Sequence, residues 1–311
     1  MTGTDISRRS AILLSFAGLA VFGCAWGATQ PLTKVAVSTG HLPLGLIFWQ
    51  LAFGAILLGA IAAARRMRIG LTARHLFYYL LIGLIGTIVP GVFSYLAIRH
   101  LPAGVAALAI ATVPMISLTI ALAIGNETFR LRRVGGVVLG VTAMMAIALP
   151  EASLPDRAMA PWLLVALIAP ACYGIEGNVV ARLAPRDMHP IAVLAAASAT
   201  GALIAAPLAW ITGQWVDLTQ SWEAAEWAIL GSAVAHAAAY SGYMWLIAFA
   251  GVVFTSQVAY VVTGSAIAMS MIFLGESYSA WVWLAIALMA LGLTLVQPAG
   301  KMPEPEPASA A

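Results

Sequence analysis

The segment FLGESY at residues 273–278 closes one long apolar run and is followed directly by another. A related segment, IGNETF, stands at residues 124–129, again between two apolar runs. In both copies a small residue lies nine positions past the glutamate: Gly136 in the first and Ala285 in the second. The shared spacing predicts two versions of one helix-turn-helix unit, and the rest of the chain can be interpreted around that duplication.

The composition indicates a membrane protein. Of the 311 residues, 62% are hydrophobic and 9% are charged, against roughly 45–50% and 25% in soluble domains. Ten apolar runs approach the ~20 residues that cross a bilayer as a helix. We number them spans 1 to 10: residues 11–37, 43–63, 75–98, 102–124, 132–149, 160–183, 190–212, 226–249, 253–275 and 279–297. Because they lack the alternation of barrel strands, we expect an all-α membrane protein with ten transmembrane helices.

The basic residues predict the orientation. If residues 1–10 form a cytoplasmic N-terminus, twelve of the fifteen Lys and Arg residues fall on the cytoplasmic side, and only Lys34, Arg99 and Arg157 fall outside. That excess matches the positive-inside rule. We therefore expect a multi-pass protein of a bacterial inner membrane with both termini in the cytoplasm, ending in a disordered, Pro/Glu-rich tail at 298–311.

The duplication extends over two halves, residues 11–149 and 160–297, with an offset of 147 to 149 positions. For example, Trp26-Gly27 corresponds to Tyr173-Gly174, and Lys34 corresponds to Arg182. Each half holds five spans, an odd number, so the second five-helix repeat is predicted to be inverted relative to the first. Inverted repeats place a substrate site near the bilayer midplane and give alternating access, which favours a carrier over an enzyme.

With these features the chain resembles the drug/metabolite transporter superfamily, specifically its EamA-type exporters. The resemblance covers residues 10–297 and rests on the ten spans, the Trp26-Gly27 pair with Lys34 eight residues later, and a glycine and glutamate after spans 4 and 9. In the first copy Asn126 separates the glycine from the glutamate, which departs from the pattern. The resemblance implies a basket of ten helices around a central cavity, with spans 5 and 10 outside it. It also points to exporters of amino acids, including aromatic ones.

Glu127 and Glu276 follow spans that end on opposite membrane faces. A charge at a span end reaches water at little cost. We therefore expect these glutamates to pin the turns from span 4 to 5 and from span 9 to 10, while the site lies deeper.

Glu176 is the one acidic residue well inside a predicted span. A charge at the centre of a membrane helix costs about 2.5–3.5 kcal/mol on insertion scales, so such residues usually face a cavity or a partner. Three interpretations stay open: a site for a substrate ammonium, a proton-coupling carboxylate, or a structural pair with Arg182. Tyr173 and Asn178 flank Glu176 and are further candidates.

Span 8 carries a polar and aromatic stripe at i, i+4 and i+7: His236, Tyr240 and Tyr243. This spacing puts all three on one helical face, either to line a substrate cavity or to pack against a neighbouring helix. By the same reasoning the substrate-binding candidates also include Trp26, Gln30, Tyr95, Gln257 and Tyr260.

No Lys or Arg lies at the middle of any predicted span, so the cavity lacks the basic groups that a phosphorylated substrate requires. Aromatic rings, amides and one carboxylate suit a zwitterionic, cationic or uncharged small molecule.

We expect an exporter of amino acids or similar amphiphiles. The rival of the same class is a proton-coupled exporter of cationic drugs, and the rival of another class is a membrane-embedded enzyme or non-transporting sensor. The expected partners are the substrate, the lipid bilayer and protons as a candidate coupling ion. We expect no nucleic acid, cofactor or metal, and either a monomer or a weak homodimer.

Overall fold

The structure is a computed structural model that describes residues 3–125, 127–149, 154–180, 183, 185, 187–250, 255 and 257–296. The named elements in this part of the chain are all helical, and η1 and η3 are π-helical whereas η2 is a 3₁₀ turn. In chain order they are α1 (Gly3–Ser38), α2 (Pro43–Ala64), α3 (Ala73–Leu81), η1 (Ile82–Ile88), α4 (Val89–His100), α5 (Ala103–Ile110), α6 (Val113–Ala123), α7 (Leu131–Ala148), η2 (Arg157–Met159), α8 (Ala160–Ala166), α9 (Ile168–Ile175), η3 (Glu176–Val180), α11 (Pro190–Ile211), α12 (Ala224–Ala250), α14 (Val258–Leu274) and α15 (Ala280–Val296).

Each predicted apolar run overlaps a helix or a contiguous set of short helices among these residues. Seven of the helical stretches, from Ser10–Ser38 to Pro190–Ile211, are long and apolar enough to cross a membrane, while α14 and α15 are apolar but shorter, with 17 residues each. The all-helical, multi-pass class is therefore confirmed. Ten spans in two inverted halves stay a prediction, and the predicted tail at 298–311 lies outside the described residues.

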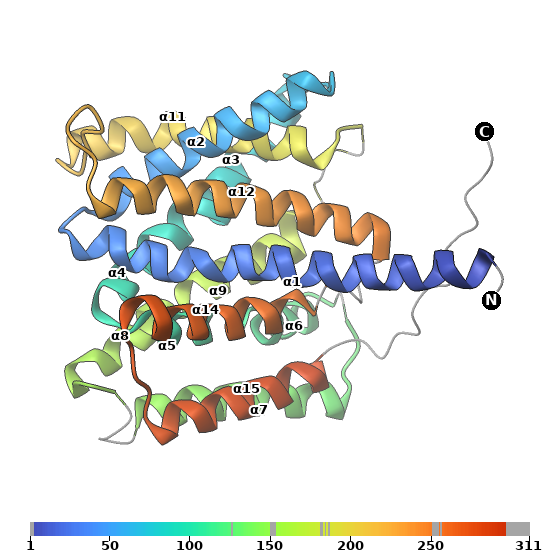
Figure 1. Ribbon diagram of the computed structural model, residues 1–311, viewed down its shortest axis with the longest axis vertical. Helices are drawn as coiled ribbons and strands as arrows, with labels where there is room; N and C mark the ends of the chain where they lie inside the picture. The colour runs from blue at the N-terminus through green and yellow to red at the C-terminus, as the bar shows by residue number, and fades with distance from the viewer. Residues whose placement is uncertain are drawn as a thin grey trace.

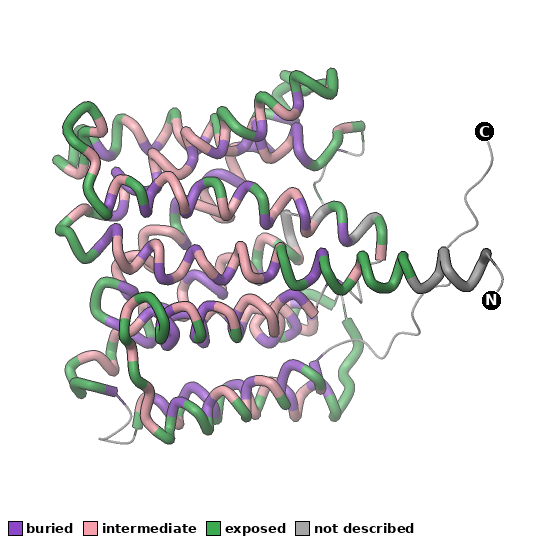
Figure 2. Tube along the Cα trace, viewed as in Figure 1, coloured by how far each residue is buried: buried purple, intermediate pink, exposed green. Residues whose placement is uncertain are grey.

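The helices lie side by side in a bundle, with α1 near its middle (Figure 1). Helix α1 packs between α12 and α14, α2 and α11 form one edge, and α7 and α15 form the other. Buried residues gather on the faces where helices meet, and the outward faces are largely exposed (Figure 2). The buried set is rich in alanine, valine, leucine and isoleucine. Small side chains let membrane helices approach closely, which maximises their van der Waals contact.

The duplicated segments end their helices with the same backbone geometry. Gly125 and Gly275 adopt positive φ angles of 72° and 67°, which glycine tolerates without steric cost. The amide of each following glutamate donates to the carbonyl six residues earlier: Glu127 to Ala121 and Glu276 to Ser270, both at 3.3 Å. This bond spans one residue more than the 6→1 contact of a Schellman cap, so both helices end in a slightly wider turn. The two copies therefore share a helix end, even though the first has one more residue between its glycine and glutamate.

Small residues bring α7 and α15 into close contact. A Cβ built on Gly136 of α7 comes within 2.6 Å of the Gly292 carbonyl oxygen of α15, and a Cβ on Gly292 comes within 2.9 Å of the Gly136 carbonyl oxygen. The two backbones therefore touch at a position where any larger side chain would separate them.

This contact predicts a specific loss of stability. We expect Gly136→Leu to force α7 and α15 apart and to destabilise the purified protein in detergent by about 1–3 kcal/mol, the usual range for overpacking. The measurement is the midpoint of thermal unfolding. The matched control is Gly135→Leu, because a Cβ on Gly135 has no atom within 4 Å. Equal midpoints for the two variants would contradict the proposed packing.

Candidate functional site

An aromatic cluster joins α1 to α12 in the middle of the bundle. The Trp26 ring lies 6.0 Å from the His236 ring, 6.0 Å from the Tyr240 ring and 5.8 Å from the Tyr243 ring, measured between centroids. The three residues of α12 at i, i+4 and i+7 share one helical face, and this face is turned toward Trp26. Edge-on and tilted rings at these separations are favourable aromatic pairs.

Glu176 stands where α9 passes into the π-helical segment η3. Its carboxylate lies against Gly86 of the other π-helical segment, η1, since a Cβ on Gly86 would meet Glu176 Oε1 at 2.5 Å. Residue 86 must therefore lack a side chain for the carboxylate to occupy this place. π-Helical turns are rare and occur frequently at functional sites.

The carboxylate belongs to the same neighbourhood as the aromatic cluster. Glu176 lies within coulombic range of the hydroxyl groups of Tyr173 and Tyr240, and Tyr173 lies within that range of Tyr95. The polar candidates from α4, α9, η3 and α12 thus converge.

Trp26, Tyr173, Glu176, His236 and Tyr240 are each half-buried, so each keeps part of its surface accessible. The arrangement offers one carboxylate, several hydroxyl groups and a wall of aromatic rings to a small molecule.

A second polar group adjoins this cluster. The Tyr95 hydroxyl donates a hydrogen bond to Gln50 Oε1 of α2. Gln50 is absent from the sequence-based candidates, although it is the single amide in the apolar run at 43–63. That isolation was the signal that could have identified it.

The remaining candidates have different surroundings. Asn178 of η3 donates its amide to Ser117 of α6 and to the Gly174 carbonyl of α9, so it serves an internal contact between helices. Gln257 lies at the N-cap of α14, and Tyr260 packs against the hydrophobic cluster around α5, α7 and α15. The carbonyl oxygen of the Gln30 side chain is buried with no hydrogen-bond partner among the described residues. Arg182, the alternative partner of Glu176, lies outside the described residues.

In the part of the chain that the structure describes, no group of three or more His, Cys, Asp or Glu side chains is placed to hold a metal ion.

Two charged side chains hold the short turn between α4 and α5, and we call this set of contacts the clasp. Lys34 Nζ donates to the carbonyls of Ile98 (2.8 Å), Arg99 (3.3 Å) and Leu101 (2.9 Å) at the end of α4. Glu276 accepts from the amides of Ala103 (2.7 Å) and Gly104 (3.2 Å) at the start of α5.

Each charge sits where the helix dipole favours it, a cation at a C-terminus and an anion at an N-terminus. The clasp links α1, α4, α5 and the end of α14. It lies at the end of the bundle that the sequence predicts to be the outer face.

A tyrosine completes the clasp. The Tyr278 hydroxyl donates to Glu276 Oε2 at 2.5 Å. Burial, and then the hydrogen bond to this carboxylate, raise the pKa of Tyr278, so the phenol stays protonated and remains a donor.

Both repeated glutamates hold the turns that they were expected to pin. Glu127 accepts from Arg133 at 2.8 Å in the turn between α6 and α7, and Glu276 accepts from Tyr278 in the turn between α14 and α15. The contact of Glu276 with α5 was not expected. The contact joins residues 172 and 173 positions apart, which local spacing does not reveal.

In the described part of the chain, apolar helices long enough to cross a membrane enclose polar and aromatic side chains, as in a membrane protein that handles a small molecule. The model of the EamA-like transporter family matches residues 11–149 and again residues 160–297. These matches cover most of the chain, and the protein belongs to this family. Its members are transporters of small molecules in membranes.

One solved structure, described only as the crystal structure of a protein, superimposes with a TM-score of 0.56 at 18% sequence identity. The match covers 93% of this chain and 97% of that one. At this identity the likeness shows the fold alone. A comparison with curated protein sequences gave no match.

The clasp predicts a measurable stabilisation. We expect Glu276→Gln to destabilise the protein by about 1–2 kcal/mol. A neutral amide lacks the attraction of a carboxylate for the N-terminus of α5, and its NH₂ group would face a backbone N–H group of α5. Thermal unfolding in detergent measures the difference. The control is Glu223→Gln, at an exposed glutamate. A loss no larger than that of the control would refute the role of the Glu276 charge.

Proposed function

We propose that the protein is a secondary transporter of a bacterial inner membrane that exports amino acids, aromatic ones among them, or similar amphiphiles. The observation that carries this proposal is the convergence of Glu176 with Trp26, Tyr173, His236 and Tyr240 in the middle of the bundle. A single carboxylate attracts an ammonium group. The aromatic wall accepts an apolar or aromatic side chain.

The charge distribution supports exclusion of phosphorylated compounds. Among the ion pairs of the described residues, none joins Glu176 to a Lys or Arg, and Arg182 lies outside those residues. The Glu176 carboxylate would repel a phosphate group placed beside it, and this repulsion is strong at low dielectric.

Alternating access follows from the proposed arrangement of two inverted halves. Because Glu276 caps the first turn of α5, the end of α14 lies beside the start of the α5–α6 stretch. The end of α6, with Gly125, is then at the opposite end of the bundle from Gly275. The two copies of the repeated segment thus have similar backbone geometry at opposite ends, which supports inversion. The clasp corresponds to a closed outer end.

The same geometry supports the orientation. Arg65, Arg66 and Arg68 follow α2, and the other described basic residues on that side adjoin α3 and α7, whereas Lys34, Arg99 and Arg157 belong to the opposite end. The start of α1 and the end of α15 lie on one side of the bundle in Figure 1. A cytoplasmic location for both termini agrees with this asymmetry.

A second candidate is a proton-coupled exporter of cationic drugs. It is favoured by the same carboxylate, because a lipophilic cation needs an anion and aromatic faces but no group that binds a substrate carboxylate. The two candidates differ in whether the substrate must carry a carboxylate as well. Membership of a transporter family weighs against the enzyme and sensor alternatives.

Flux into liposomes that contain the purified protein tests the proposal. We expect radiolabelled phenylalanine to enter faster than into empty vesicles, and Glu176→Gln to lower this flux about tenfold or more, as loss of a charged hydrogen bond does. Glu223→Gln is the control for the loss of a carboxylate at an exposed site.

The panel includes other amino acids and the lipophilic cation tetraphenylphosphonium, each with and without a pH gradient. Transport of the cation alone would support the drug exporter. If no compound in the panel moves faster than into empty vesicles, the carrier function itself is refuted.

A further inference from the structure

Two glycines of the π-helical segment η1 let two different elements approach its backbone. A Cβ built on Gly83 comes within 3.3 Å of the Gly201 Cα atom of α11, so two backbones touch there. A Cβ built on Gly86 meets three atoms of the Glu176 carboxylate, Oε1 at 2.5 Å, Cδ at 2.8 Å and Oε2 at 3.0 Å. The whole carboxylate of Glu176 therefore lies against bare backbone.

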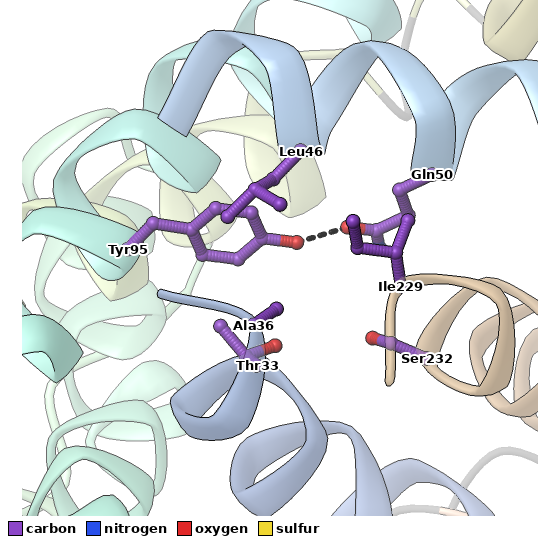
Figure 3. A pocket seen from close by; sticks show the side chains of 7 residues that line it. All are labelled: Thr33, Ala36, Leu46, Gln50, Tyr95, Ile229 and Ser232. Atoms are coloured by element: carbon purple, nitrogen blue, oxygen red, sulfur yellow. Dashed lines mark hydrogen bonds between the residues drawn. The ribbon is translucent and has the colours of Figure 1, made fainter. Parts of the chain in front are cut away.

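The backbone of η1 is held near its start and beyond its end. Near the start, the contact of Gly83 with α11 joins two backbones, and neither can rotate away as a side chain does. Beyond the end, η1 continues directly into α4, and the Tyr95 hydroxyl of α4 donates to Gln50 of α2 (Figure 3). The segment that carries Gly86 is therefore fixed to both α11 and α2.

The space beside the Tyr95–Gln50 pair is small. A pocket there, which Thr33 and Ser232 also line, has a volume of about 10 Å³ for water (Figure 3). This is room for roughly one molecule, and the Ser232 side of the pocket is buried, with 5% of that residue exposed. The pocket is too small to take a displaced helix, so α4 and the end of η1 cannot shift into it.

The side chain of Glu176, in contrast, can change its rotamer. Non-bonded heavy atoms reach their optimal separation at about 3.5 Å, so a methyl group at residue 86 would displace the nearest carboxylate oxygen by roughly 1 Å. A movement of this size takes a hydrogen bond between the carboxylate and an ammonium group out of its normal geometry. A side chain at residue 86 would thus move the charge and leave the helices in place.

We propose that Gly86 is a positioning residue of the transporter, whose missing side chain sets the place of the Glu176 carboxylate and so the place at which an ammonium group binds. The inference rests on the proposed binding of an amino acid at Glu176, and it gives a role to a residue that needs no contact with the substrate. Residues 86 and 176 then act as one unit, because the size of one side chain limits the length of the other.

A double-mutant cycle tests this unit. In liposomes we expect Gly86→Ala to lower phenylalanine uptake about tenfold at subsaturating concentration, as loss of a well-placed charged hydrogen bond does. Glu176→Asp is expected to cause a similar loss, since its carboxylate is drawn back by roughly the 1.5 Å of one carbon–carbon bond. The shorter side chain no longer meets a methyl group at residue 86. The double variant is therefore expected to transport at the rate of Glu176→Asp alone.

Two other glycines provide the controls. Gly83→Ala strains the same segment at its contact with α11 and not at Glu176, so any loss that it causes is expected to multiply with that of Glu176→Asp. Gly59→Ala replaces a helical glycine of α2 whose Cβ would have no atom within 4 Å, and it is expected to transport at the wild-type rate. Unfolding midpoints of the purified variants show which of them are folded.

Full multiplication of the two single losses in the double variant, to about a hundredfold, overturns the proposal, because independent sites behave in this way. Unchanged uptake in Gly86→Ala also overturns it. So does suppression of the Gly83→Ala loss by Glu176→Asp, since both glycines would then act through the fold of η1. If Gly86→Ala fails to fold even together with Glu176→Asp, the carboxylate does not make room for the methyl group, and the proposal is wrong.

A measurement that needs no transport separates this inference from the proposed function. If the wild type moves no compound of the panel, the proposed function is refuted, and labelling of Glu176 by dicyclohexylcarbodiimide, detected by mass spectrometry, decides the role of Gly86. Because the reactivity of a carboxyl group depends on its surroundings, we expect the labelling rate to change about threefold or more in Gly86→Ala. The rate is expected to stay the same in Gly83→Ala and Gly59→Ala. Equal rates in Gly86→Ala and the wild type overturn the inference.

Discussion

The Leu101–Pro102 turn interrupts helical hydrogen bonding between α4 and α5, where unpaired carbonyl and amide groups are costly next to lipid. Lys34 satisfies the carbonyls on one side of this turn, and Glu276 satisfies the amides on the other. The candidate site depends on this arrangement, because the clasp holds α1 and α4, which supply Trp26 and Tyr95. A charged pair at a helix break therefore positions residues well away from the break itself.

Much of the fold could be predicted from the chain alone. Apolar run length predicts the helices to within a few residues, as at Pro43–Ala64 against 43–63. The repeated glycine and glutamate predict two similar helix ends, and the positive φ angles of Gly125 and Gly275 bear this out. The π-helical segments η1 and η3 were not foreseen, because they depend on how the helices pack against each other rather than on local propensity.

The candidate site was predictable in kind and less so in composition. The helical period placed His236, Tyr240 and Tyr243 on one face, and Trp26 indeed contacts that face. Asn178 looked equivalent in the sequence, yet Ser117 of α6 takes up its amide. Gln50 and Ser232 were overlooked because a single polar residue in an apolar run does not show which neighbour it faces. Only the packing of α1, α2, α4 and α12 distinguishes a pocket from an internal contact.

The brevity of the Leu101–Pro102 turn has a mechanical consequence. Two residues cannot absorb a large displacement of one helix relative to the other, so a motion of the end of α4 carries the start of α5 with it. Separation of α1 from this turn would break the three carbonyl bonds of Lys34, and separation of the end of α14 would break the two amide bonds of Glu276. The clasp thus resists the departure of two different helices from one rigid corner.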